Sequence, residues 1–257
     1  MTEGDRVGEA TARRYVDRDV EAILVHVSIG QIFSAYRNHV RRWETLPDGL
    51  ALVMMRQGLA ATILDLTIRP RDAHVAWTIN ITEPPINLFL TGGADQSTVT
   101  GRVFTEGVKT TQRSRLFLEV SDPRKGASQS SIEVSGLDII QIFDQYYAQS
   151  EQTLTRGFEL DDEEFLLIQA LPQADPKWFR SLDQKAARDL MAAQSEVLDT
   201  RTFAFRCGCS KDRMLSVIQA IYYDKPADLF KGEDGVEVFC PRCGRRWWIE
   251  RESFGTE

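Results

Sequence analysis

Cysteine is scarce in this chain of 257 residues, and the first 206 residues contain none. All four cysteines lie between Cys207 and Cys243, in the last fifth of the sequence. No apolar run approaches the roughly 18 residues that cross a bilayer. The polar start, Met1 to Arg6, has no signal-peptide core. We therefore expect a cytoplasmic protein without a membrane partner. Its clustered thiols would stay reduced and serve a metal site or a redox sensor rather than structural disulfides.

Histidine is also scarce, and no local motif joins a general base to a nucleophile. His26, His39 and His74 lie far apart, and we expect each to be an ordinary surface or core residue. The glycine-rich stretch 92–97 has no following lysine, so it predicts a hairpin turn and no phosphate-binding loop. The acidic run Asp161–Glu164 is typical of a solvated turn. These observations predict that the protein is not an enzyme.

The formal net charge of −7 is distributed unevenly along the chain. Residues 203–257 carry nine Lys and Arg against nine Asp and Glu, so the first 202 residues hold the whole excess of acid. An acidic body with a neutral C-terminal segment matches a phosphate backbone poorly. We therefore do not expect nucleic acid as a partner.

The hydrophobic pattern predicts an α+β fold, because hairpins are many and no regular βαβ alternation occurs. Apolar spacings of three and four residues predict helices at 29–43 and 138–149. Apolar residues on most faces predict a helix at 50–66 that is buried in a core or an interface, and a further helix is expected at 211–222. Alternating or short apolar runs predict strands at 20–25, 73–81, 86–90, 98–104, 115–120, 131–134, 153–160, 165–171, 202–205, 236–239 and 246–251. Residues 1–19 show no period, which predicts a frayed arm. Ser135 is the expected N-cap of the helix at 138–149.

Three parts are expected along the chain. The prolines in 172–176 mark a boundary, which gives a mixed sheet-and-helix domain at 1–175, a helical linker at 176–202 and a zinc module at 203–257. The linker is rich in alanine and has a weak apolar stripe, so docking must hold it in place. The module has 55 residues, and so small a domain usually needs stabilisation beyond its apolar core, such as a bound metal.

The cysteines form two short pairs. Cys207 and Cys209 flank one glycine, and Cys240 and Cys243 flank a proline and an arginine. Zinc takes four tetrahedral ligands, and each short pair can close a chelate on one side of the ion. Gly244 lets backbone amides turn toward the sulfur atoms. The spacing therefore predicts one zinc ion held by all four thiolates.

Two questions about this module stay open on its own residues. Zinc-bound thiolates are nucleophilic, and their oxidation to disulfides ejects the metal, so a redox switch stands beside the favoured alternative of inert structural zinc. A basic and aromatic cluster adds a nucleic-acid-binding zinc ribbon as a further alternative, and its residues are Arg242, Arg245, Arg246, Trp247 and Trp248. We favour a strand whose tryptophans pack the module while its arginines stay solvated.

The residues around both pairs, 205–213 and 238–246, resemble the switch module of the redox-regulated 33-kDa heat-shock chaperone family. Residues 146–152 are similar to the end of that family's signature helix. The first third of the chain departs from the family pattern, because the region 39–47 lacks the usual proline-rich turn. The specific part of the resemblance is the arrangement of the cysteines.

This resemblance implies a holdase that works without ATP. The four cysteines would bind one zinc ion in the reduced, inactive state. Peroxide with unfolding stress, or hypochlorous acid, would form the disulfides Cys207–Cys209 and Cys240–Cys243. Zinc would then leave, the module and linker would lose structure, and homodimers would bind unfolded or partly unfolded client proteins. The resemblance thus favours a redox role over inert structural zinc.

Overall fold

The structure, a computed structural model, contains a large sheet, several helices and a small separate hairpin. It describes residues 8–47, 49–108, 112–194, 196–223 and 225–254. The strands are β1 (Glu9–Asp17), β2 (Ala22–Ser28), β3 (His74–Ile81), β4 (Ile86–Gly93), β5 (Thr98–Phe104), β6 (Arg115–Asp122), β7 (Gly126–Glu133), β8 (Thr155–Asp161), β9 (Glu164–Ala170), β10 (Val197–Phe205), β11 (Gly235–Phe239) and β12 (Arg246–Glu250). The α-helices are α1 (Gly30–Val40), α2 (Gly49–Ile68), α3 (Ile139–Tyr146), α4 (Pro176–Ser181), α5 (Gln184–Ala193), α6 (Lys211–Tyr222) and α7 (Pro226–Phe230). The arrangement confirms the predicted α+β class.

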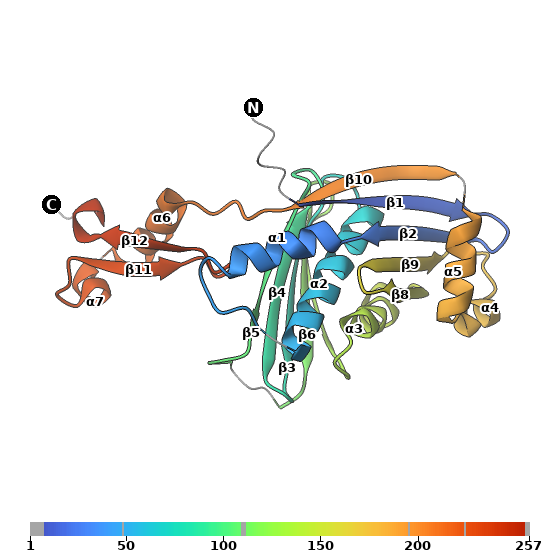
Figure 1. Cartoon of the computed structure of the whole chain (residues 1–257), viewed down its shortest axis with the longest axis horizontal. Coiled ribbons are helices and arrows are strands. Elements are labelled where there is room, and N and C mark those ends of the chain that lie inside the picture. Colours follow the sequence, from blue (N-terminus) through green and yellow to red (C-terminus); the bar gives the residue numbers. More distant parts are fainter. Residues whose placement is uncertain (1–7, 48, 109–111, 195, 224, 255–257) are drawn as a thin grey trace.

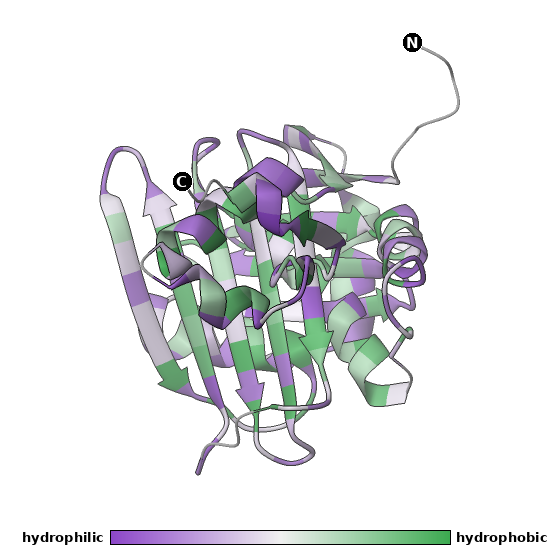
Figure 2. Ribbon diagram, turned by 90° about the vertical axis from the view of Figure 1, so that its left-hand side faces the viewer, coloured by the Kyte–Doolittle hydropathy of each residue, from purple (hydrophilic) through white to green (hydrophobic). Residues whose placement is uncertain are grey.

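Ten of these strands form one sheet, in the order β7-β6-β3-β4-β5-β10-β1-β2-β9-β8 (Figure 1). Neighbouring strands are antiparallel except β5 and β10, whose parallel ladder has only two pairs, Ala204 with Thr98 and Phe205 with Val99. Hydrophobic and hydrophilic residues alternate along the strands, as Figure 2 shows, so that the sheet has an apolar face. The two halves of the sheet therefore meet at a short seam, just before the cysteine-containing segment.

Helix α2 lies at the centre of the core and packs against both halves of the sheet. Its apolar residues face all sides, as the sequence predicts, and Gly58 lets it approach β4 closely. A Cβ atom at Gly58 would lie 2.6 Å from Leu90 Cδ1. The helix is also long and apolar enough to cross a membrane, which corrects the expectation that no segment comes near that limit. Inside the protein 78% of the relevant window is buried, so α2 serves as a core helix.

The N-terminal strand is missing from the sequence prediction. The pattern predicts a frayed arm over 1–19, but residues 9–17 form β1, which pairs with β2 on one side and β10 on the other. Residues 1–7 lie outside the described part of the chain. Ala10 and Ala12 are among the buried residues of β1, and alanine gives little hydrophobic signal. The strand is stabilised by partners that local periodicity does not contain.

A glycine pair and a helix cap also differ from the prediction. Gly92 and Gly93 lie inside β4 rather than in the turn, which follows at 94–97. Glycine is required at 92 because a Cβ atom there would lie 2.7 Å from the backbone carbonyl oxygen of Thr98. Asp138 rather than Ser135 caps α3, and its carboxylate accepts hydrogen bonds from the next turn's backbone amides at 2.8 and 3.3 Å.

The predicted helical linker at 176–202 is helical only in its first part. Helices α4 and α5 end by Ala193, and residues 197–205 form β10 beside β1. Its β-branched and aromatic residues suit a strand, with Arg201 and Phe203 buried. Pairing with the free edge of β1 outweighs the helical pattern of the preceding residues. β10 also crosses the expected boundary at 202, while the division into three domains itself stays a prediction.

The C-terminal module projects from one end of the sheet (Figure 1). A hairpin of β11 and β12 is flanked by α6 and α7, and α6 has the predicted bounds. α7 lies between the predicted helix at 211–222 and the predicted strand at 236–239, where no helix was predicted. The buried side chains of the described module are few, and α6 contributes none of them. After the end of β10 at Phe205, they are Phe230, Cys240, Cys243, Ile249 and Phe254.

Candidate metal centre

The four cysteine sulfur atoms come together between the end of β10 and the tip of the β11–β12 hairpin. The Sγ atoms of Cys207 and Cys240 are 3.8 Å apart, and those of Cys209 and Cys243 are 3.6 Å apart. All four lie within 4.8 Å of one another. A tetrahedron with metal–sulfur bonds of about 2.3 Å has sulfur–sulfur edges of about 3.8 Å. The donor set and its spacing therefore fit a tetrahedral thiolate site for a metal ion such as zinc.

The first pair lies in a loop between a strand and a helix. β10 ends at Phe205, two residues before Cys207, and α6 begins just after Ser210. The Ser210 hydroxyl accepts a hydrogen bond from the backbone N–H of Arg213 at 3.2 Å, which caps α6. The Arg213 guanidinium in turn donates to the carbonyl of Gly208 at 3.0 Å. These bonds orient the loop so that both thiols face the hairpin.

The second pair lies in the turn that joins β11 to β12. The backbone N–H of Cys240 donates to the carbonyl of Arg245 at 2.8 Å, and that of Gly244 donates to the Cys240 carbonyl at 2.9 Å. Gly244 has φ of +76°, a conformation that favours glycine. Cys240 and Cys243 are only 1% and 3% exposed, whereas the other two cysteines are half-buried. Cys240 and Cys243 are thus the two cysteines of the cluster that are shielded from solvent.

The close thiols perturb one another's ionisation. Hydrogen bonding from Cys207, supported by Cys243, lowers the pKa of Cys240 to about 2. The bond to Cys240 raises the pKa of Cys207 to about 12, and the pKa of Cys243 rises far above its usual value for the same kind of reason. Neighbouring thiolates repel one another. A divalent cation would offset that repulsion, because it stabilises all four charges at once.

A histidine from the body reaches this cluster, and the sequence does not predict it. Nε2 of His39, near the end of α1, lies 2.9 Å from the carbonyl oxygen of Cys243. Burial lowers the pKa of His39, so the neutral imidazole donates this hydrogen bond. Among the described residues, the ion-pair partners of His26 and His74 are carboxylates, Glu164 at 3.5 Å and Asp95 at 3.0 Å. No signal in the sequence links residue 39 to residue 243, because only the fold brings them together.

The basic and aromatic residues after the second pair are engaged within the protein to different degrees. Arg246 pairs with Glu237 at 2.9 Å. The guanidinium carbon of Arg245 lies 5.9 Å from the ring centre of Trp43 and 5.4 Å from that of Trp247. The indole of Trp248 covers Gly235 but is more than half exposed. The described contacts of Arg245 and Arg246 are therefore to side chains of the protein itself.

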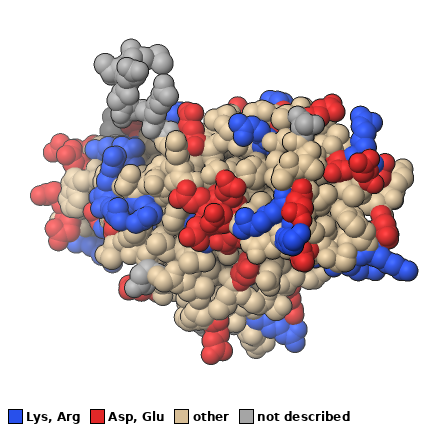
Figure 3. All heavy atoms as spheres, turned by 45° about the vertical axis from the view of Figure 1, so that its right-hand side comes forward, with Lys and Arg blue, Asp and Glu red and all other residues tan. Residues whose placement is uncertain are grey.

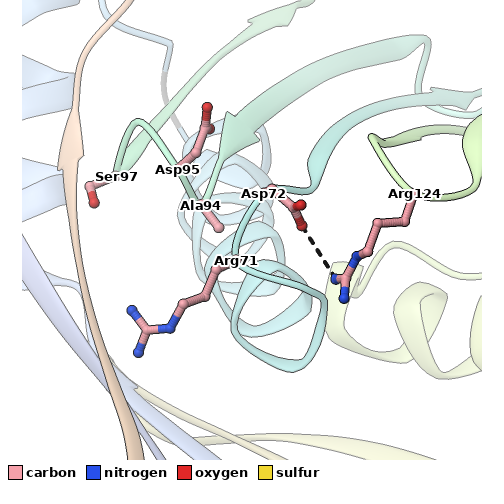
Figure 4. A pocket seen from close by; sticks show the side chains of 6 residues that line it. All are labelled: Arg71, Asp72, Ala94, Asp95, Ser97 and Arg124. Atoms are coloured by element: carbon pink, nitrogen blue, oxygen red, sulfur yellow. Dashed lines mark hydrogen bonds and ion pairs between the residues drawn. The ribbon is translucent and has the colours of Figure 1, made fainter.

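Away from the cysteines, charged side chains are mixed in sign. Figure 3 shows acidic and basic groups side by side on one face of the molecule. A hollow of about 730 Å³ near the β4–β5 turn is drawn in Figure 4. Its two arginines already have acidic partners, since Arg124 pairs with Asp72 at 3.4 Å and Arg71 pairs with Asp199. This balanced, open hollow lies apart from the cysteine cluster.

Comparison with known proteins gives consistent matches. A model of the Hsp33 protein family matches residues 24–250. A 33 kDa chaperonin from Nitrosococcus oceani is 24% identical over 225 residues, with 76% of this chain and 77% of that protein covered. One from Acaryochloris marina is 23% identical over 272 residues, with 89% and 91% covered. The crystal structure of a 33 kDa chaperonin, a heat shock protein 33 homolog from Thermotoga maritima, has a TM-score of 0.72 at 14% identity and covers 96% of each chain.

Fold and site together define a class in which a large α+β body carries a small module built on a cysteine cluster. The chain belongs to the Hsp33 family, as the resemblance around its cysteines implies. It is therefore a member of a heat-shock chaperone family. The Thermotoga structure shares its fold, and the matched relatives are named as chaperonins rather than as enzymes.

Proposed function

We propose that this protein is a redox-regulated chaperone that binds unfolding proteins without ATP. The main support is the cluster of four cysteine Sγ atoms within 4.8 Å in a member of the Hsp33 family. The reduced protein is inactive, and oxidation of the cluster activates it. We place the protein in the cytoplasm, where reduced thiols keep such a switch in its inactive state.

In the reduced state Cys207, Cys209, Cys240 and Cys243 hold one zinc ion. Bound zinc supplies charge for the four thiolates and folding free energy on the order of 10 kcal/mol. The described module needs this contribution, because its apolar core is limited to residues such as Phe230, Ile249 and Phe254. The ligands come in two pairs from segments that lie 30 residues apart in the sequence, so one zinc ion would join the two segments.

Oxidation forms one disulfide in each sequence pair, Cys207–Cys209 and Cys240–Cys243. Two thiolates lose two electrons as their S–S bond forms, and one peroxide takes these electrons with two protons to give two waters. Two peroxides therefore oxidise the cluster. Sulfurs within a disulfide are poor ligands, so the oxidised pairs no longer retain the ion. The module then loses the free energy that kept it folded.

The segment that joins body and module follows the module when it unfolds. Within α5 only Ala187 is buried, while Phe179 and Leu182 anchor α4 against the β8–β9 end of the sheet. β10 pairs with β5 through only two residue pairs, so its attachment to that half of the sheet is short, while its ladder with β1 is longer. Weakly attached elements open at low free-energy cost. Their release exposes apolar surface, on which homodimers bind unfolded or partly unfolded client proteins.

The test follows zinc, thiols and client binding in one sample. The reduced protein is treated with hydrogen peroxide at elevated temperature, and a chromogenic chelator reports zinc release. Mass spectrometry assigns the disulfides, light scattering reports aggregation of a heat-sensitive client, and analytical ultracentrifugation reports dimers. We expect about one zinc per chain to leave, the two disulfides named above to form, and aggregation to be suppressed only after oxidation.

A matched variant controls for oxidation of other sulfur. Met214→Leu removes the single methionine of residues 203–257 and should respond as the wild type does. Zinc that stays bound during oxidation would overturn the proposal. Zinc that leaves with no gain in client binding would also overturn it.

A further inference from the structure

Three arginines and one aspartate meet where β1, β10 and the chain after α2 come together. Asp199 on β10 pairs with Arg71 and, at 3.0 Å, with Arg201. Arg14 lies on β1 opposite Asp199 in the antiparallel ladder. We call these four residues the arginine cluster. Burial would raise the pKa of Asp199, but the three guanidinium groups, led by that of Arg201, lower it below its usual value. One carboxylate thus serves three arginines, which leaves an excess of two positive charges.

Arg14 brings a buried donor to which the protein offers no acceptor. Its Nε atom is buried and makes no hydrogen bond among the described residues. A buried N–H group without an acceptor costs free energy. The ladder between β1 and β10 is irregular just after this residue, because Tyr15 pairs with Val197 and Leu198 is passed over. Such bulges redirect side chains and are frequent beside functional sites. The strand therefore holds a charged donor at a place where an added acceptor would satisfy it.

Arg201 closes the arginine cluster on its inner side. Only 7% of its side chain is exposed, and its Nη1 donates to the carbonyl of Leu66 at 2.6 Å. Leu66 lies in the last turn of α2, so this bond also offsets the negative end of the helix. Burial and the two neighbouring guanidinium groups lower the pKa of Arg201 despite the charge of Asp199. A further anion would relieve the repulsion among the arginines.

Arg71 lies on the solvent side of the cluster. Its side chain is 69% exposed, and Figure 4 shows it extending away from Asp72 and Arg124, on the side where β10 runs. The same residue lines the hollow of about 730 Å³ near the β4–β5 turn. A ligand can therefore reach the cluster from solvent, and a small group attached to it would extend into the hollow. Asp72 and Asp95 also line the hollow, which disfavours a long polyanion.

We propose that the arginine cluster binds a phosphate dianion, either free phosphate or the phosphate group of a small monoester. The planar fork of a guanidinium group matches two phosphate oxygens, and two negative charges balance the excess of the cluster. The bound anion joins β1 and the chain after α2 to β10, the strand that leads into the cysteine module. Binding is independent of the proposed chaperone function. Its consequence, a higher threshold for release of the joining segment, rests on that function.

The test titrates inorganic phosphate into the full-length, reduced, zinc-loaded protein by calorimetry, with the ionic strength held constant by chloride. A second titration with glycerol phosphate separates an esterified ligand from the free ion. Arg14→Gln should weaken phosphate binding about tenfold, because it removes a charge-assisted donor. Arg13→Gln is the matched control, since this neighbour is exposed and alternation places its side chain on the opposite face of the sheet. The control should bind phosphate as the wild type does.

Two further measurements keep the result independent of a change in folding. Asp199→Asn should tighten phosphate binding about tenfold, because it removes the carboxylate that competes for the arginines. In the wild type, phosphate at about ten times its dissociation constant should slow amide exchange in β10 about tenfold and leave β11 and β12 unchanged.

Three results would overturn the proposal. They are equal phosphate affinity in the Arg14→Gln and Arg13→Gln proteins, binding of long polyphosphate alone, and no binding of either small phosphate. Because no readout involves oxidation or a client, failure of the chaperone proposal would not affect this test.

Discussion

The body and the module of this chain are stabilised in opposite ways. In the body, α2 is enclosed by the sheet and by α3, and residues such as Ile63 are fully buried. In the module, α6 has no buried residue, and Ile221 is 61% exposed. The deepest side chains of the module include Cys240 and Cys243. Apolar burial can therefore hold the body by itself, whereas the proposed metal bound by the four cysteines would supply most of the stability of the module.

The largest expected effect comes from removing one cysteine. Cys243→Ser should abolish tight zinc binding and cost the module folding free energy on the order of 10 kcal/mol, while the body stays folded. Hydrogen exchange followed by mass spectrometry should show lost protection in α6, β11 and β12, with α2 unchanged. Unchanged protection in β11 and β12 would contradict the view that the cysteines hold the module. Loss of protection in α2 would show that body and module fold as one unit.

The same substitution in two helices measures the contrast directly. Ile63→Ala in α2 should lower the free energy of unfolding by about 2–5 kcal/mol, because it leaves a cavity in the core. Ile221→Ala in α6 should change it by less than about 0.5 kcal/mol, because that side chain is mostly in solvent. Urea unfolding of both variants under reducing conditions tests the pair. Similar losses in the two variants would mean that the exposed face of α6 is covered by a partner.

Body and module should also respond to pH with opposite signs. Burial raises the pKa of Asp144 to about 7, although its carboxylate accepts a hydrogen bond from the Gly157 N–H at 2.7 Å. The folded body thus binds this proton more tightly than the unfolded chain, so its stability falls as pH rises from about 4 to about 7. Zinc affinity of the module should rise over the same range, because its thiols must lose protons to bind the metal.

Asp144→Asn tests the assignment for the body. Asparagine keeps the acceptor for Gly157 and removes the titration, so the variant should be more stable than the wild type at pH 7.5 and show a shallower pH dependence. Urea unfolding at pH 5 and pH 7.5 measures the stability of the body in the variant and the wild type. Zinc titration at the same pH values measures the zinc affinity of the module. An unchanged pH slope in the variant would assign the effect to another group.

The smallest expected effects come from helix caps. Asp138→Ala should lower the stability of the body by about 1 kcal/mol, and Ser135→Ala should cost less than half of that. Ser210→Ala removes the cap of α6 and should cost the module a similar free energy. Because folding and zinc binding are linked in the module, this loss should be measured as about fivefold weaker zinc binding. Body unfolding and zinc titration separate the two outcomes. A larger loss of stability for Ser135→Ala than for Asp138→Ala would show that Ser135 caps α3, as the sequence predicts.

Local patterns predicted the elements that carry their own signal. The helix at 211–222 and the hairpin of 153–160 with 165–171 were found because their periodicity is contained within each segment. The four cysteines were grouped by spacing alone, and their sulfur atoms do lie together. β1 was missed, and only residues 202–205 of β10 were predicted as strand, because the two strands stabilise each other although they lie far apart in the sequence. His39 was missed for the same reason, since its partner is a backbone carbonyl that any residue could provide.

The sequence by itself determined the class of the fold, the family and the set of four thiols, because residue types and short spacings are written along the chain. Only the tertiary structure decided that β10 completes the sheet, and that the turn of the second cysteine pair rests on His39, Trp43 and Glu44. Such contacts join residues far apart in the chain through backbone groups and single side chains. Their free energy depends on distances that exist only after folding, so no local pattern records them.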